Sequence, residues 1–207
     1  MVDEEWRELL WGQLGGAIDM LENAILACPD EVWRAGEPAR ALWYLTYHTL
    51  FFLDLYTFGT LDGFAPPAPF TLDELDPAGV YPERAYSRAE LVEYLRACRD
   101  KCQTAIAALT QETAERQCEF GWVKESYAEL VLRNIRHVQH HTAQLNWVLG
   151  ERTGAAPRWD ESPSKLTTSL SIATMPNFRM HPSLRSMFGW SLSMFGAGRE
   201  MRGVGGN

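Results

Sequence analysis

The sequence lacks the features of disulfide-rich and secreted proteins. Its four cysteines (Cys28, Cys98, Cys102 and Cys118) form no CxxC pair and are too widely spaced for a small disulfide framework. The first residues, MVDEEWRELLWGQL, are acidic and lack the basic start and apolar stretch of a signal peptide. We therefore expect reduced thiols and a cytoplasmic protein.

Basic clusters and long apolar runs are also missing. The chain has 19 Lys and Arg residues against 27 Asp and Glu residues, a formal net charge of -8, which argues against a nucleic-acid-binding surface. The most apolar segment, residues 42–58, carries His48 and Asp54 and is shorter than the roughly 20 apolar residues of a membrane span. A small-molecule substrate or another protein chain is the expected partner, not a nucleic acid or a membrane.

No common phosphate-binding or hydrolase motif is present. The sequence contains no GxGxxG, Walker A, HExxH or GxSxG pattern, and the glycine cluster GAGREMRGVGG follows no predicted strand. Cys98 and Cys102 are four residues apart and could bind a soft metal, but small thiols that fill a core are the simpler interpretation. Any catalytic chemistry must therefore come from other side chains.

What the sequence does contain is helical periodicity. Apolar residues recur at helical spacing over about 3–27 and 38–58, and a glycine, Gly59, ends the second helix. Two capping boxes open further helices, Ser87 to Glu90 and Ser126 to Glu129, and the last helix is predicted to end near Gly150. No convincing strand is predicted.

The connections between these helices are unequal. Residues 59–86 are rich in proline and glycine, which exclude a long regular element and make this segment a long crossover between the second and third helices. We predict an all-α four-helix bundle over residues 1–155. Residues 156–207 are rich in Ser, Gly and Met without a sustained apolar period, and are predicted to form an irregular or loosely docked tail.

Three of the five histidines crowd the last helix, in RNIRHVQHHTAQLNWVLGER. His137 and His141 are four residues apart, so they stack on one face, which we predict to point into the bundle interior. His140 falls on a more polar strip and is predicted to lie at the edge. His181, in the tail, has no partner nearby in sequence.

His48 interrupts the apolar face of the second helix. A lone buried histidine is usually a hydrogen-bonded core residue, but burying three unpaired imidazoles would cost on the order of a few kcal/mol each. A shared divalent ion would satisfy all three at once. Asn134 and Gln144 flank the helix-four pair one turn away and are the candidates for hydrogen bonds to metal ligands.

Two other kinds of side chain are candidates for the site. Asp54 lies about 120° from His48 around the helix, so a solvated or salt-bridged carboxylate is favoured over a fourth ligand. Five tryptophans are most simply core and interface anchors, with a stacking site for an aromatic substrate as the alternative. They are Trp6, Trp11, Trp43, Trp122 and Trp147.

These features together resemble the DinB/YfiT-like superfamily of metal-binding four-helix bundles. The resemblance is carried by the histidine within LWYLTYHTLFFLDLYTFG, the long crossover, and RHVQHHTAQL, which is similar to the family pattern NHxxHHRGQ. It covers about residues 1–152. Thr142 and Ala143 replace the family's usual Arg and Gly, which leaves the ligands intact but puts substrate contacts near that turn in question.

The resemblance implies a metal triad of His48, His137 and His141, with Gln144 in the place of the family's Gln. Three protein ligands leave positions open for water or a thiol, an arrangement typical of catalytic sites. Zinc or nickel suits imidazole ligands, and iron or manganese remains an alternative. Members of the superfamily include thiol-dependent transferases and isomerases, so a low-molecular-weight thiol is an expected cosubstrate and a homodimer an expected assembly.

Three hypotheses follow for the function. The leading one is a metal-dependent thiol transferase or hydrolase that acts on a small molecule. The second is a non-catalytic, stress-associated helical module whose metal is structural or absent. The third is a dimer scaffold in which hydrogen bonds, rather than a metal, satisfy the histidines.

Overall fold

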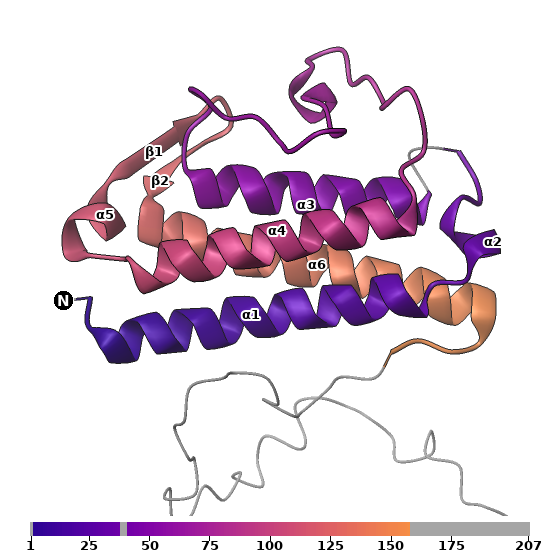
Figure 1. The fold of residues 1–207 in the computed structure, drawn as a ribbon, viewed down its shortest axis with the longest axis horizontal. Coiled ribbons are helices and arrows are strands. Elements are labelled where there is room, and N and C mark those ends of the chain that lie inside the picture. The colour runs from indigo at the N-terminus through magenta and orange to yellow at the C-terminus, as the bar shows by residue number, and fades with distance from the viewer. Residues whose placement is uncertain (1, 38–40, 158–207) are drawn as a thin grey trace, which may run out of the picture. The chain divides into compact units, whose positions relative to one another are not determined.

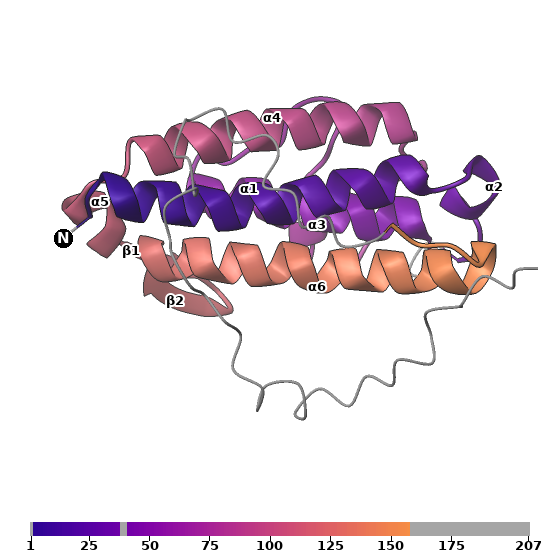
Figure 2. The same cartoon turned by 90° about the horizontal axis from the view of Figure 1, so that it is seen from below.

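Four long helices form a bundle in the computed structural model, which describes residues 2–37 and 41–157 (Figure 1). They are α1 (Glu4–Ala27), α3 (Leu42–Phe58), α4 (Arg88–Ala107) and α6 (Tyr127–Thr153). α1 and α3 each pack against both α4 and α6, so α1 and α3 occupy opposite corners of the bundle (Figure 2). The all-α four-helix bundle predicted from the sequence is confirmed.

Capping residues set the helix ends. The predicted capping boxes at Ser87 and Ser126 are both formed, with the serine side chain and the Glu side chain three residues later exchanging hydrogen bonds with the backbone. α3 ends at Gly59, which takes the left-handed conformation with φ 86°. α6 runs past the predicted end near Gly150 because the left-handed cap is Gly154, with φ 70°.

The predicted absence of strands is wrong. Between α4 and α6 the chain forms an antiparallel hairpin in which Gln117 pairs with Ser126 and Phe120 with Val123. A two-residue turn joins the strands, and Cys118 and Phe120 are buried in alternation with exposed neighbours. The short elements are α2 (Asp30–Trp33), η2 (Asp73–Leu75), α5 (Gln111–Glu115), β1 (Gln117–Phe120) and β2 (Val123–Ser126).

The long crossover packs onto α3 and α4. Its Phe70 is buried and stacks on Tyr94 of α4, with 4.4 Å between ring centroids. The Tyr47 hydroxyl of α3 donates a hydrogen bond of 2.8 Å to the carbonyl of Thr71. The Phe70 ring and the Thr71 carbonyl thus anchor the crossover immediately before η2, and they place η2 beside α3.

The core contains fewer tryptophans than predicted. Trp43 is buried and Trp11 is partly buried against the core. Trp6 and Trp122 are about half exposed and Trp147 is 69% exposed, so these three do not anchor the core, and their role at an interface stays a prediction. The fully buried positions are filled mainly by leucine, isoleucine, tyrosine and phenylalanine.

Asp54 is buried and salt-bridged. Its side chain is 1% exposed, one carboxylate oxygen lies 2.8 Å from Lys101 Nζ, and the Tyr94 hydroxyl donates to the other at 3.1 Å. The prediction of a salt-bridged carboxylate is confirmed, whereas a solvated one is excluded. A buried carboxylate needs such partners to stay charged.

No described helix is long and apolar enough to cross a membrane. The predicted tail, residues 156–207, lies outside the described residues apart from positions 156 and 157, and so does His181. The boundary between bundle and tail therefore stays a prediction.

Candidate metal centre

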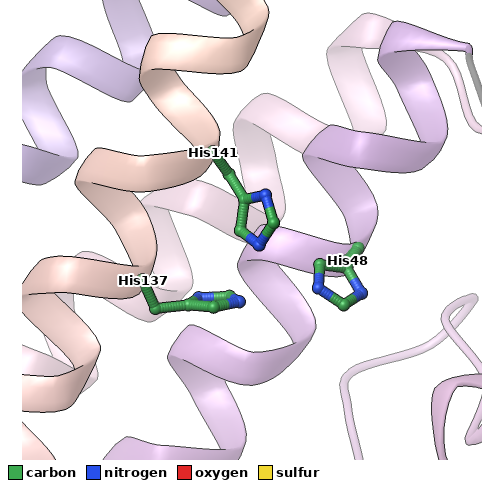
Figure 3. Close-up of side chains that lie close together, drawn as sticks. All are labelled: His48, His137 and His141. Atoms are coloured by element: carbon green, nitrogen blue, oxygen red, sulfur yellow. The ribbon is translucent and has the colours of Figure 1, made fainter.

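Three histidines from two helices converge on one space (Figure 3). His48 projects from the middle of α3, and His137 and His141 project from successive turns of α6. The ring centroids are 4.5 Å apart for His137 and His141, 4.9 Å for His48 and His141, and 5.5 Å for His48 and His137. One nitrogen atom from each ring lies within 4.8 Å of the other two.

The triad lies at the wall of a cavity and not in the dry interior that the sequence suggested. All three histidines are partly buried, and the His48 side chain is 28% exposed. The cavity has a volume of about 530 Å³. Besides the triad it is lined by Phe52, Tyr56, Glu74, Leu75, Asp76, Pro77 and Trp122. The site is therefore accessible to a small molecule.

Glu74 orients His48. The Glu74 carboxylate, whose side chain is only 6% exposed, lies 2.7 Å from His48 Nδ1. A carboxylate only accepts hydrogen bonds, so in the neutral imidazole Nδ1 carries the proton and Nε2 carries the lone pair. Metal-binding histidines commonly have such a carboxylate partner.

Gln144 has the same relation to His141. Its side-chain oxygen lies 2.7 Å from His141 Nδ1, and its amide nitrogen lies 3.2 Å from His140 Nε2. Both ends of the amide are therefore used, which fixes the orientation of the side chain. His141, like His48, is left with a free Nε2 lone pair. His140 itself is exposed, as predicted.

The remaining ligand candidate has an unsatisfied nitrogen. His137 Nδ1 is buried, and no hydrogen-bond partner for it exists among the described residues. Burial lowers the pKa of His137 to about 3, and it lowers the pKa of His141 to about 4, with the neighbouring histidines adding to both shifts. Both imidazoles are therefore neutral at neutral pH, the protonation state that metal binding requires.

The donor set fits a divalent metal ion. Nitrogen ligands lie about 2.0–2.1 Å from zinc, so the nitrogens of a tetrahedral site lie about 3.4 Å from one another. The three nitrogens, which lie within 4.8 Å of one another, would therefore move inward on binding a common ion. The neutral rings of His137 and His141 and the fixed tautomers of His48 and His141 agree with a shared ion.

Asn134 and the two family departures lie beside the triad on α6. The Asn134 amide nitrogen donates to the Leu53 carbonyl at 3.1 Å, so it ties α6 to α3, and its proposed contact to a ligand stays a prediction. Thr142 is fully buried, whereas Ala143 is exposed. Thr142 cannot reach a molecule in the cavity without a rearrangement.

Sequence reasoning missed Glu74. It lies in η2, within a crossover whose prolines and glycines gave no periodicity from which to place a side chain. The acidic segment DELD was a signal that a carboxylate lay in this crossover, but not that it reaches His48. The cavity residue Tyr56 was likewise not singled out.

Comparison with known proteins gives a family. Neither curated proteins nor solved structures yield a significant match. A sequence model of the DinB superfamily matches residues 13–145, which include the whole of α3 and all three histidines of the triad. The chain belongs to the DinB superfamily.

Proposed function

We propose that this protein is a metal-dependent enzyme that acts on a small molecule. His48, His137 and His141 would hold one divalent ion, and the adjoining cavity would receive the substrate. The observation that carries the proposal is the convergence of three imidazole nitrogens, within 4.8 Å of one another, at the wall of a cavity of about 530 Å³. A closed structural site would instead supply four protein ligands.

The protein's own residues prepare the site. Glu74 and Gln144 hold the Nδ1 protons of His48 and His141, so that both Nε2 lone pairs are available without rearrangement of the tautomer. Burial keeps His137 and His141 neutral. When bound, a divalent ion at such a site lowers the pKa of a coordinated thiol or water and so supplies a nucleophile at neutral pH.

The chain offers no thiol of its own for this chemistry. All four cysteines are buried, and none lines the cavity. Burial raises the pKa of Cys28 to about 11 and that of Cys102 to about 12, so these thiols stay protonated. The nucleophile would therefore be water or an external thiol, and the superfamily resemblance favours a low-molecular-weight thiol.

The imidazole set favours zinc or nickel, with iron or manganese as alternatives. The first experiment is metal analysis of protein purified without chelators and without a nickel column. We expect about one divalent ion per chain in the wild type and a large loss in His137→Ala. The exposed neighbour His140→Ala is the matched control and should retain the ion.

The outcomes separate the proposal from its rivals. Absence of an ion from both the wild type and the variants would refute the metal site. If removal of the metal abolishes the cooperative thermal transition, the ion is structural and the non-catalytic hypothesis gains support. If the metal-free protein stays folded, activity screens with low-molecular-weight thiols and electrophilic small molecules, with and without metal, test the catalytic step.

A further inference from the structure

One wall of the cavity is aromatic. Phe52 and Tyr56 come from successive turns of α3, and Trp122 comes from the turn of the β1–β2 hairpin. The centroids of Phe52 and Tyr56 lie 5.7 Å and 6.1 Å from that of His137, so this wall adjoins the triad. A ligand in the cavity can therefore contact both the triad and this wall.

The Trp122 ring is held in place although half of it is exposed. Phe120 stacks on it at 5.6 Å with an interplanar angle of 26°, and Phe52 meets it edge-on at 6.1 Å. Its indole Nε1 donates a hydrogen bond of 3.1 Å to the Tyr56 hydroxyl oxygen. An exposed aromatic ring that is fixed by three neighbours presents a rigid apolar surface at low entropic cost.

The Tyr56 hydroxyl has a proton to spare. An indole N–H only donates, so the Tyr56 oxygen must be the acceptor in this bond and its own proton points elsewhere. Within residues 2–37 and 41–157 no acceptor for that proton is found. Burial raises the pKa of Tyr56, so the phenol is neutral and able to donate at neutral pH. Because Tyr56 lines the cavity, an acceptor bound there can reach the proton.

We propose that Tyr56 is a substrate-binding residue, and that the cavity takes a small molecule with a flat apolar body bearing a hydrogen-bond-accepting oxygen such as a carbonyl. The body lies against Trp122 and Phe52, and the Tyr56 hydroxyl donates to the oxygen. Trp122 fixes the direction of that hydroxyl. The inference rests on the proposed function for the reaction, and it deepens that function by naming the substrate class.

A pair of probe molecules tests the binding step. Acetophenone and ethylbenzene share a flat ring of similar size, but only acetophenone has a carbonyl oxygen. Their dissociation constants are measured by ligand-observed NMR on the full chain after chelator treatment, so that no carbonyl–metal bond contributes. We expect both probes to bind to the wild type. Tyr56→Phe should weaken the binding of acetophenone relative to that of ethylbenzene by about 3- to 10-fold, the size expected for one neutral hydrogen bond.

Two further variants control the result. Tyr81→Phe removes the hydroxyl of an exposed tyrosine that does not line the cavity. It should leave unchanged the ratio of the dissociation constant of ethylbenzene to that of acetophenone. Trp122 lies at an exposed turn, so Trp122→Phe is not expected to impair folding. This variant should lower the ratio and weaken the binding of both probes. An unchanged ratio in Tyr56→Phe, an equal change in Tyr81→Phe, or no binding of either probe would overturn the inference.

The experiment also separates this inference from the proposed function. Metal content is measured on the same preparations before chelation. A protein that binds no metal but shows the Tyr56-dependent ratio would refute the metal-dependent enzyme and keep the binding site. A protein that binds metal through the triad but shows no Tyr56-dependent change in the ratio would keep the proposed metal site and refute the substrate-binding role of Tyr56.

Discussion

Nδ1 of His48 lies 2.7 Å from a carboxylate oxygen of Glu74, across 26 residues of sequence. The two residues belong to different parts of the fold, His48 to the middle of α3 and Glu74 to η2 in the crossover. The bond joins a carboxylate with 6% side-chain exposure to an imidazole at the cavity wall. The crossover is therefore part of the candidate metal centre and not only a connection between helices.

Removal of the Glu74 carboxylate should weaken metal binding. We expect Glu74→Ala to lower the affinity of the triad for zinc by about 10- to 100-fold, because His48 loses the acceptor that fixes its tautomer. Glu74→Gln keeps an acceptor without the charge and should fall between the wild type and Glu74→Ala. Competition titration with a coloured chelator measures the affinities. Glu83→Gln, at an exposed site in the same crossover, should have no effect.

Gln144 should contribute less than Glu74. It offers His141 a neutral amide oxygen, and hydrogen bonds to charged acceptors are roughly twice as strong as those to neutral ones. We expect Gln144→Ala to lower zinc affinity by about tenfold or less. His140→Ala, which removes the other partner of the same amide, is the control and should retain nearly full affinity. A larger loss in Gln144→Ala than in Glu74→Ala would contradict the assigned order.

The sequence was sufficient for the parts of the fold that local rules decide. The capping boxes at Ser87 and Ser126 located the starts of α4 and α6 because a cap depends on residues only three positions apart. The second helix, α3, has no side-chain cap and starts at Leu42 and not near residue 38 as predicted. The hairpin was missed because its strands are only four residues long, too short for a clear alternation. The end of α6 was misplaced because two glycines, Gly150 and Gly154, can both end a helix.

The candidate site likewise contains residues that local spacing predicts and residues that only long-range packing brings together. His137 and His141 share a helix, so their spacing predicted that they lie on one face, and the mid-helix position of His48 made it a candidate partner. Glu74, Tyr56 and Trp122 reach the cavity through long-range packing, such as the docking of Phe70 on Tyr94. Residue spacing carries no information about such contacts. Exposure was also misjudged, since the triad lies at a cavity wall.

The buried pair of Asp54 and Lys101 gives a stability prediction that is independent of the metal. Lys101→Met leaves the 1% exposed Asp54 carboxylate with only the Tyr94 hydroxyl as a partner. Since Lys101 is 48% exposed, water can partly replace it, and we expect a loss of about 1–3 kcal/mol in the free energy of unfolding. Urea titration measures it.

The same variant provides a check on the site. Neither Asp54 nor Lys101 lines the cavity beside the triad; both line a separate cavity of about 410 Å³. Zinc affinity measured in the absence of urea should therefore match the wild type within about twofold, since residues without shared partners act independently. Loss of metal binding in Lys101→Met would show that the two sites are coupled.

Lowering the pH should destabilise the metal-free protein even at pH values above those at which carboxylates titrate. The folded-state pKa values of His137 and His141, about 3 and about 4, lie below the ordinary value of 6.5, so between these limits the unfolded chain binds more protons than the folded one. Stability is thus complete above pH 6.5 and falls as the pH drops. Between pH 7 and pH 5 we expect chelator-treated protein to lose on the order of 3–4 kcal/mol in the free energy of unfolding.

Variants assign this loss to the triad. His137→Gln removes one of the two shifted groups, so urea titrations at pH 7 and pH 5 should show about half the wild-type difference. His140→Gln removes an exposed imidazole that is only a minor cause of the two pKa shifts, and should keep most of the difference. Because ordinary carboxylates titrate near pH 4, the window ends at pH 5 to exclude them. Equal acid sensitivity of the wild type and His137→Gln would mean that burial of His137 does not oppose its protonation.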